Sequence, residues 1–176
     1  MIRVIAGEFG GRNLRTPEGR DVRPSSGLLR KVIFDLIGPR VMNTTVLDLY
    51  AGPGSLGIEA LSRGANECTF VERHPLCLRL LRENLQTLGL EDRSHIAAAD
   101  TAEFCRNDHS RYDGILVDPP YADWAKLQSL GLQRLLAPQG FLVVQGPSHA
   151  PDDPLGLGSM RRRAKTHGKS KVVIYE

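Results

Sequence analysis

The segment Asp118, Pro119, Pro120 and Tyr121 has the residue types and order needed to hold a planar amine for reaction. It ends an apolar run at residues 114–118, which is typical of a buried strand. The exocyclic amine of a nucleic-acid base is a poor nucleophile, and carboxylate and carbonyl acceptors for its N–H bonds could raise its reactivity toward a methyl sulfonium. The two prolines fix φ and remove two backbone donors, which leaves carbonyls free to face the amine. Tyr121 offers a flat face on which a flipped-out base could stack.

A second candidate element is a glycine-rich turn that follows an apolar strand within residues 46–57. Glycines let the backbone approach a ligand closely, and the N–H groups that start the next helix supply donors. Gly52, Gly54 and Gly57 also satisfy the dinucleotide fingerprint, and Glu72 stands where an acid that binds the adenosine ribose is expected. The motif alone does not separate NAD from S-adenosylmethionine.

Two aspartates beside these strands bear on the choice of cofactor. Asp48 comes just before the glycine turn, where its carboxylate would repel a pyrophosphate but could bind a cationic cofactor end or its water. This favours a sulfonium amino acid. Asp100 could receive an adenine amino group, with Thr101 beside it, and capping of a helix by Asp100 is an equal alternative. The candidate cofactor residues are Asp48, Tyr50, Ala51, Gly52, Gly54, Glu72, Arg73, Asp100 and Thr101.

The place of Asp118 in the chain favours chemistry over its structural alternative, which is a rigid turn with Asp118 as a helix cap. The residue ends the fourth expected strand of the series, which lies downstream of the glycine turn, where a substrate group would meet the cofactor. Trp124 follows closely, and we expect it to be a packed cover rather than a stacking platform. The five histidines share no ligand spacing, so no metal site is expected.

Short apolar runs alternate with amphipathic segments after residue 45, which predicts an α/β fold with a parallel sheet and crossover helices. The expected strands are Thr45–Leu49, 68–72, 95–98, 114–118 and 141–145, with a terminal hairpin at 160–164 and 172–175. This gives a Rossmann-like sheet of seven strands, mostly parallel and ending in an antiparallel hairpin. The clearest helix is Pro75–Leu88, which starts with proline, carries leucines on one face and stops at Gly89.

Residues 1–40 are expected to form a hairpin and helix extension before the main domain of residues 41–176. Its expected parts are extended segments at 3–6 and 12–15, a glycine turn between them, a capping Ser25 or Ser26, and apolar residues at helical spacing from Leu28 to Ile37. Arg30 falls among those apolar residues.

The composition fits one globular domain, with 176 residues of which 41% are hydrophobic and 24% charged. Neither a membrane-spanning run nor the apolar core of a signal peptide is visible, which predicts a cytoplasmic protein. Cys68, Cys77 and Cys105 are odd in number and widely spaced, which favours buried thiols over disulfides or a zinc site.

The charges are segregated along the chain. Residues 1–40 carry 8 Lys and Arg against 4 Asp and Glu, residues 158–176 carry 6 against 1, and the middle is acidic. Two basic ends suit a polyanionic partner, while a solvated surface is the alternative. The basic run at residues 161–163 could likewise contact RNA or guard an edge hairpin against pairing.

In this order, the motifs resemble those of the amino-methyltransferases, and the whole chain resembles the 16S rRNA (guanine-N2) methyltransferase family (RsmD-like). The resemblance rests on Arg3-Val-Ile-Ala-Gly7, Arg23-Pro-Ser-Ser26, Leu47-Asp-Leu-Tyr-Ala-Gly52, Glu59-Ala-Leu-Ser-Arg-Gly-Ala65, Phe70-Val-Glu72, Asp118-Pro-Pro-Tyr121 and the closing Gly168 turn. Two segments depart from the family pattern. Gly27-Leu-Leu-Arg-Lys-Val32 lacks one arginine and one glutamate of that pattern, and His167 replaces a tyrosine.

The resemblance implies S-adenosylmethionine as cofactor, 16S rRNA in an assembling 30S subunit as substrate, and the N2 amine of one guanine as target. It also implies that the segment Arg-Pro-Ser-Ser and the next helix lie over the active site and touch RNA. With the basic ends, the candidate RNA residues are Arg12, Arg23, Ser25, Ser26, Arg30, Arg161 and Arg162. A monomer is expected.

Two alternatives stay open at this point. The amine-orienting logic also suits a DNA adenine-N6 methyltransferase, although only about 45 residues precede the cofactor fold, which is short for a DNA-recognition domain. From another class, the chain could be a non-catalytic RNA-binding assembly factor that keeps a cofactor pocket.

Overall fold

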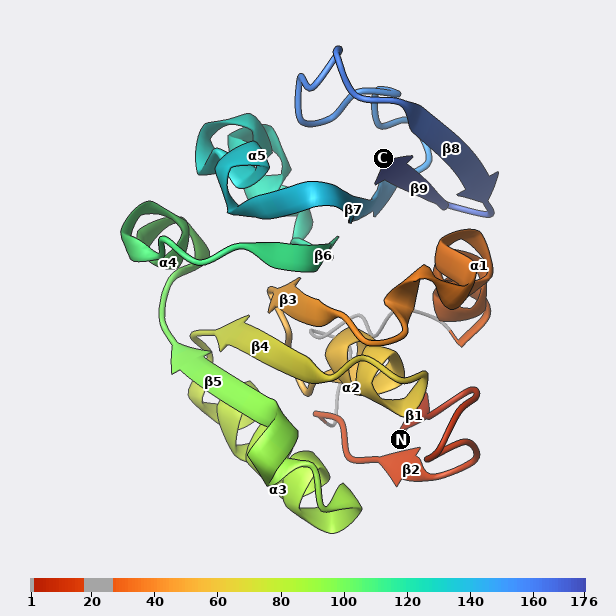
Figure 1. The fold of residues 1–176 in the computed structure, drawn as a ribbon, viewed down its shortest axis with the longest axis vertical. Coiled ribbons are helices and arrows are strands. Elements are labelled where there is room, and N and C mark those ends of the chain that lie inside the picture. Colours follow the sequence, from red (N-terminus) through yellow and green to blue (C-terminus); the bar gives the residue numbers. More distant parts are fainter. Residues whose placement is uncertain (1, 18–26) are drawn as a thin grey trace.

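The computed structural model of the chain describes residues 2–17 and 27–176, apart from the side chain of Tyr121. The main sheet consists of β3 (Thr45–Leu49), β4 (Glu67–Glu72), β5 (Ser94–Ala98), β6 (Tyr112–Val117), β7 (Leu136–Pro147), β8 (Arg162–His167) and β9 (Ser170–Tyr175). These seven strands lie in the order β5-β4-β3-β6-β7-β9-β8 (Figure 1). The strands β3 to β7 pair in parallel, while β9 is antiparallel to both neighbours. The predicted α/β class and mixed seven-stranded sheet are confirmed.

The helical segments follow the strands in alternation. They are α1 (Gly27–Ile37), η1 (Gly38–Val41), α2 (Ser55–Ser62), α3 (Pro75–Leu88), η2 (Glu91–Arg93), α4 (Thr101–Asn107), η3 (Tyr121–Leu130) and α5 (Leu132–Leu135). The bounds of α3 are those predicted, because Pro75 needs no amide partner in the first turn and Gly89 adopts a left-handed φ of 64°.

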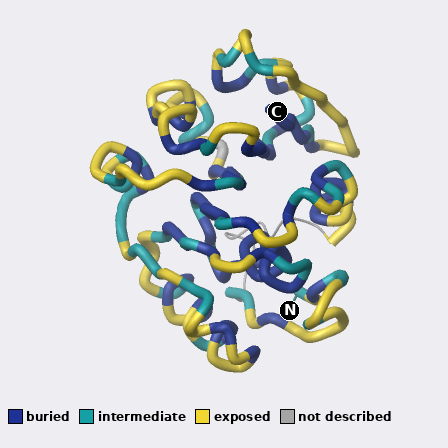
Figure 2. Tube along the Cα trace, in the orientation of Figure 1, coloured by how far each residue is buried: buried dark blue, intermediate teal, exposed yellow. Residues whose placement is uncertain are grey.

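Alternating strand residues build a core on each face of the sheet. Val46 and Leu116 point into the cluster that also holds the apolar residues of α1, α2 and α3. Leu47 and Val117 point into the cluster with α4, η3 and α5. Figure 2 shows the central strands largely buried between these two layers, whereas β8 at one edge is exposed and β5 at the other has no fully buried residue. The period of two along a strand therefore produces the three-layer architecture.

The predicted N-terminal hairpin is present but shorter than expected, since β1 (Ile2–Arg3) pairs antiparallel with β2 (Asn13–Leu14) where extended segments were predicted at 3–6 and 12–15. It is anchored on α2 by the buried carboxylate of Glu59, which accepts hydrogen bonds from the amides of Ile5 at 2.7 Å and Ala6 at 3.1 Å. Because the anchor belongs to the same helix that follows the glycine turn, the hairpin and the turn are mechanically linked.

Arg30, which was expected to contact RNA, is only 1% exposed in the structure. Arg30 shares the inward face of α1 with Leu29, Ile33 and Phe34, as helical periodicity requires. Its Nη2 donates to the carbonyl of Arg3 at 2.7 Å. Burial lowers the pKa of the guanidinium, and the charge of Glu59 opposes that effect. The arginine is thus part of the packing between α1 and the hairpin.

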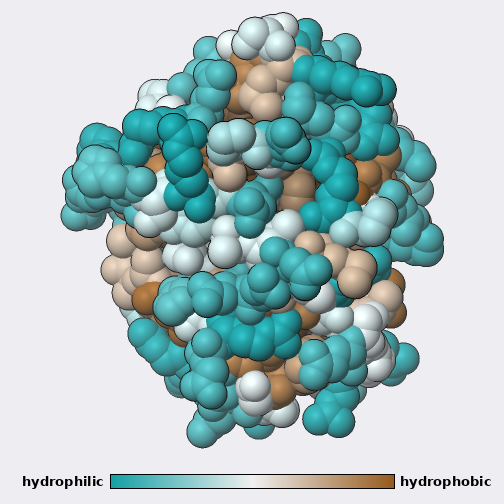
Figure 3. All heavy atoms as spheres, in the orientation of Figure 1, coloured by the Kyte–Doolittle hydropathy of each residue, from teal (hydrophilic) through white to brown (hydrophobic). Residues whose placement is uncertain are grey.

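The terminal hairpin is present, but its first strand starts at Arg162 instead of residue 160, because pairing with β9 sets the register from Arg162 to His167. All residues of β8 are exposed. Figure 3 shows hydrophilic side chains over this edge of the molecule. Arg163 reaches back to α1, where its Nη2 donates to the carbonyl of Leu36 at 3.2 Å.

Within the described residues, none of the helices combines the length and apolar character needed to cross a bilayer.

The strand order creates a switch point between β3 and β6. From β3 the chain moves outward through β4 to β5, then returns to place β6 on the other side of β3. In such sheets ligands bind beyond the carboxyl ends of the strands at this point. Both candidate motifs, the glycine turn after β3 and Asp118 after β6, are located there.

Candidate active site

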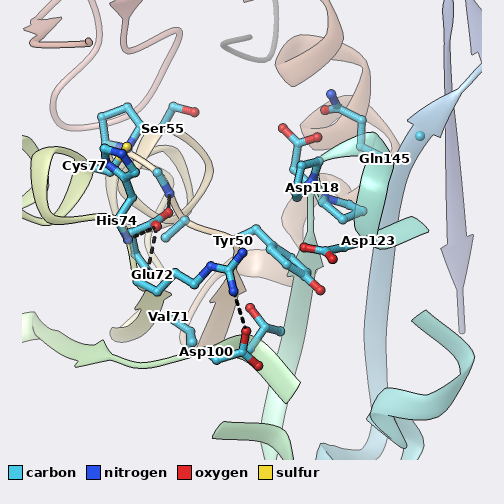
Figure 4. Close-up of a pocket in the computed structure, with 18 of the residues that line it drawn as sticks. Tyr50, Ser55, Val71, Glu72, His74, Cys77, Asp100, Asp118, Asp123 and Gln145 are labelled. Atoms are coloured by element: carbon cyan, nitrogen blue, oxygen red, sulfur yellow. Dashed lines mark hydrogen bonds and ion pairs between the residues drawn. The ribbon is translucent and has the colours of Figure 1, made fainter. Parts of the chain in front are cut away.

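A cavity of about 620 Å³ opens at the carboxyl ends of the central strands, which is within the size range of small-molecule sites. Its lining comprises Tyr50, Ala51, Gly52, Pro53, Ser55, Val71, Glu72, Arg73, His74, Pro75, Cys77, Asp100, Thr101, Asp118, Pro119, Pro120, Asp123, Gln145, Gly146 and Ser170. Figure 4 shows Glu72 and His74 at one end, Asp118 and Gln145 at the other, and Tyr50 between them. Both predicted motifs therefore contribute to one cavity.

The turn after β3 depends on left-handed backbone conformations. Tyr50, Gly52 and Gly54 have φ values of 59°, 56° and 90°. A Cβ on Gly54 would lie 2.4 Å from Cδ1 of Leu81, so this glycine lets α2 pack against α3. A Cβ on Gly52 would meet no atom within 4 Å, so its backbone borders open space. The turn therefore offers exposed backbone to a ligand.

Glu72 is held in place by the backbone around it. Its Oε2 accepts from the amide of Gly52 at 2.7 Å, and its Oε1 accepts from the amides of Arg73 at 2.8 Å and His74 at 2.7 Å. A carboxylate has about four acceptor positions, so about one stays open for a hydroxyl donor in the cavity. The side chain joins the glycine turn to the start of α3 and faces the cavity.

Asp100 caps α4 and also lines the cavity. Its Oδ1 accepts from the amides of Ala102 at 2.9 Å and Glu103 at 3.3 Å, while its Oδ2 pairs with Arg73 at 3.0 Å. Although burial opposes it, these amide bonds and the positive charge of Arg73 lower the pKa of Asp100. The helix-cap alternative and a place in the cavity wall are thus both realised.

Asp48 lies beneath the glycine turn and does not line the cavity. Its Oδ2 accepts from the amide of Gly57 at 2.8 Å in the first turn of α2. Burial raises the pKa of Asp48 to about 8, and the charges of Asp118 and Glu72 add to the rise, while the Gly57 bond opposes it. Because Gly57 is already paired, its amide is not available to a phosphate. Through this hydrogen bond, Asp48 fixes the first turn of α2 relative to β3.

The second motif stands on the adjacent strand. The strand β6 ends at Val117, and its register with β7 pairs Val117 with Val144. Asp118, which follows β6, and Gln145, which lies within β7, are therefore at the same level of neighbouring strands. Pro119 is buried, Pro120 is exposed, and both border the cavity. Carbonyl and carboxylate acceptors are thus concentrated at this end.

The predicted site residues do not all lie at the cavity. Most of the cofactor candidates line the cavity, whereas Asp48 and Gly54 lie behind its wall. Of the RNA candidates, those with exposed side chains are Arg12, Arg161 and Arg162, and Arg162 lies 3.6 Å from Asp153. Arg23, Ser25, Ser26 and the side chain of Tyr121 lie outside the described residues.

Sequence reasoning missed Asn84, which is 2% exposed on α3. Its Nδ2 donates to the carbonyl of Pro53 in the glycine turn at 2.9 Å and to that of Arg15 at 3.0 Å. Its Oδ1 accepts from the amide of Arg15 at 2.8 Å. An asparagine on a face otherwise made of leucines was the available signal, because a buried amide needs partners.

Gln145 and Gly146 on β7 were also missed as parts of the cavity. A Cβ on Gly146 would lie 2.1 Å from the Trp124 ring, so the glycine is where that indole packs. This supports the expected role of Trp124 as a packed cover.

The chain is similar to several known proteins in sequence and in structure. The family model described as Conserved hypothetical protein 95 matches residues 2–176. YlbH of Bacillus subtilis is 34% identical over 99% of this chain and 98% of its own length. Ribosomal RNA small subunit methyltransferase D of Escherichia coli is 32% identical over 69% of this chain and 61% of its own length. The solved structure of a hypothetical protein from Thermus thermophilus is 31% identical and has a TM-score of 0.83, covering 100% of this chain and 99% of the other.

Proposed function

The chain belongs to the Conserved hypothetical protein 95 family, and on that premise we propose that it transfers a methyl group from S-adenosylmethionine to the N2 amine of a guanine in 16S rRNA. A relative of the same family is named as a methyltransferase of small-subunit ribosomal RNA. The observation that carries the proposal is the single cavity with a ribose-type acid at one end and Asp118 at the other. This relative favours an RNA substrate over the DNA and non-catalytic alternatives.

The residues present fit S-adenosylmethionine. Gly52 borders open space, and Glu72 keeps about one acceptor position for a ribose hydroxyl. Asp100 and Thr101 stand at the wall where an adenine amine would be received. When bound there, the cofactor supplies a methyl group on a positively charged sulfur. The paired amide of Gly57 argues against a pyrophosphate ligand.

Asp118 and the Pro119 carbonyl would accept the two N–H bonds of the guanine amine and so orient its lone pair. No strong general base is required, because the amine becomes acidic on methylation and can lose its proton to the carboxylate or to water. Positioning then carries most of the catalysis. The stiff proline pair supports this role, since it limits movement of the acceptors.

The basic ends are proposed to bind the RNA. The bond between Arg163 and the carbonyl of Leu36 brings β8 beside α1, so the two basic ends of the sequence meet in space (Figure 1). Strand alternation puts Lys165 on the same face as Arg163. We extend the proposal to residues 1–40 as an RNA-binding extension of the domain at residues 41–176, and to a monomer acting in the cytoplasm on 30S particles.

The test begins with cofactor binding and ends with the product. Titration calorimetry should give binding of S-adenosylmethionine and none of NAD. Tritiated methyl groups should then pass to rRNA or immature 30S particles and not to duplex DNA. Mass spectrometry of rRNA from a deletion strain should show one guanine without its N2-methyl group. Cofactor binding with no transfer to any of these substrates would refute the enzymatic role and favour an assembly factor.

A further inference from the structure

Gln145 occupies the place next to Asp118 at the substrate end of the cavity. The pairing of Val117 with Val144 sets Asp118, just after β6, beside Gln145 within β7. Both line the cavity, and Figure 4 shows them as neighbours. A group held by Asp118 would therefore present its adjoining atoms to Gln145.

The carboxamide oxygen of Gln145 has no hydrogen-bond donor facing it among the described residues. The residue is 9% exposed, and its Oε1 is buried without a hydrogen-bond partner among the described residues. Buried side-chain oxygens in folded proteins are nearly always paired, and an exception in a cavity calls for an explanation. A bound molecule with an N–H group would provide the missing donor.

The edges of the bases differ beside their exocyclic amines. In guanine the N2 amine lies between N1–H, which is a donor, and N3, which is an acceptor, so a donor is present on the N1 side. In adenine the N6 amine lies between N1 and N7, and in cytosine the N4 amine is next to N3, all of which are acceptors. A carbonyl placed beside the amine site therefore pairs with guanine and faces a lone pair in the other two bases.

We propose that Gln145 is a specificity residue whose Oε1 accepts the N1–H of the target guanine while Asp118 holds the N2 amine. The inference rests on the proposed function and identifies the group that selects the base. A site built around such a bond rejects analogues that lack the donor, because its own buried oxygen would stay unpaired. The same oxygen explains why an amide follows directly on the buried apolar run at residues 141–144.

The experiment replaces the mapped guanine in ligated 16S rRNA by 2-aminopurine or 2,6-diaminopurine. Both analogues keep the 2-amine, and both carry a bare N1 in place of N1–H. The wild-type chain should methylate guanine with a kcat/KM at least about tenfold higher than either analogue. Gln145→Met, which keeps the length of the side chain without the carbonyl, should bring this ratio to within about threefold of unity by slowing the guanine reaction.

Gln145→Glu retains an acceptor and should keep the preference for guanine. Cofactor affinity should be unchanged in both variants, which separates the role from general damage. An equal guanine preference in wild type and Gln145→Met would overturn the role of Gln145 while leaving the proposed function intact. Methylation of neither guanine nor the analogues by wild type would instead refute the proposed function and this inference together. If Gln145→Met does not fold, equal kcat/KM values of the wild-type chain for guanine and 2-aminopurine would still overturn the role of Gln145.

Discussion

At the scale of single residues, Asp118 and Glu72 stand at opposite ends of one cavity, so their removal should change different constants. Asp118→Ala should lower the methylation rate by about two to four orders of magnitude while cofactor affinity stays nearly unchanged. Glu72→Ala should weaken cofactor binding, because the glycine turn loses its acceptor at Gly52. Single-turnover rates and titration calorimetry measure the two effects.

The matched control for both variants is Glu67→Ala, which removes an exposed carboxylate from β4. It should leave both constants unchanged. A parallel loss of cofactor affinity in Asp118→Ala would contradict a role confined to the amine.

Asp48 predicts a pH dependence of stability. Its pKa is raised from 3.8 to about 8 in the folded chain, chiefly by burial, so ionisation favours the unfolded state. The stability gained from its protonated form is complete below the unfolded pKa and is lost as pH rises through the folded pKa. Asp48→Asn keeps an acceptor for Gly57 and should remove this loss.

Urea unfolding of wild type and Asp48→Asn between about pH 5 and pH 8 measures the effect. The free energy of unfolding of the variant minus that of wild type should increase with pH, by at most about 1.4 kcal/mol per pH unit. Parallel curves for the two proteins would show that Asp48 does not titrate in this window.

At the scale of elements, Asn84 connects three parts of the chain. Its bonds join α3 to Pro53 in the glycine turn and to Arg15 after β2. Asn84→Ala would leave buried backbone groups unpaired, so the free energy of unfolding should fall by about 2 to 4 kcal/mol. Cofactor affinity should fall as well, because the turn loses its support. Denaturant titration and calorimetry on the same samples measure both.

Gln86→Ala on the exposed face of α3 is the control and should change neither quantity. A loss of stability with unchanged cofactor affinity would limit Asn84 to a structural role.

The strands and the helix α3 could be predicted because their signals are local. Proline, glycine and apolar spacing define α3, and the apolar runs locate β3 to β7, although β7 extends beyond the predicted 141–145 to Leu136–Pro147. The 3-10 segment η3 could not be predicted, since residues 121–130 lack a helical period and are held by packing of Leu127 and Leu130. The burial of Arg30 follows from its place among the apolar residues of α1, whereas its expected RNA contact came from the family resemblance.

The two motifs of the site were predicted from the sequence, but the residues that support or neighbour these motifs were not. The glycine turn and Asp118 carry short sequence signals, so their meeting at the switch point follows from strand order. Asn84 and Gln145 act through burial and register, which depend on which strands are neighbours. Likewise, Asp48 was assigned to the cofactor because the sequence does not show that Gly57 lies above it.

At the scale of the whole molecule, the meeting of both basic ends beside α1 predicts a strong effect of salt on RNA binding. Replacing Arg161, Lys165 and Lys169 by serine should weaken RNA binding and make its logarithmic salt dependence shallower, by about one unit for each phosphate that the variant no longer neutralises. Filter binding of rRNA at several salt concentrations measures the slope.

The exposed Arg106→Ser on α4, a helix on the opposite side of the molecule from α1 and β8 in Figure 1, is the control. It should leave the slope unchanged. The same slope in wild type and the triple variant would remove β8 from the interface.

The indole that packs on Gly146 has a practical consequence, because Trp124 is the one tryptophan of the sequence. It sits against the residue that follows Gln145, at the end of the cavity assigned to the base. Its fluorescence is therefore a built-in optical probe of that end, free of any competing emitter of its kind. Binding of the target guanine at this end should change the emission. A ligand bound only at the Glu72 end should leave the emission nearly constant.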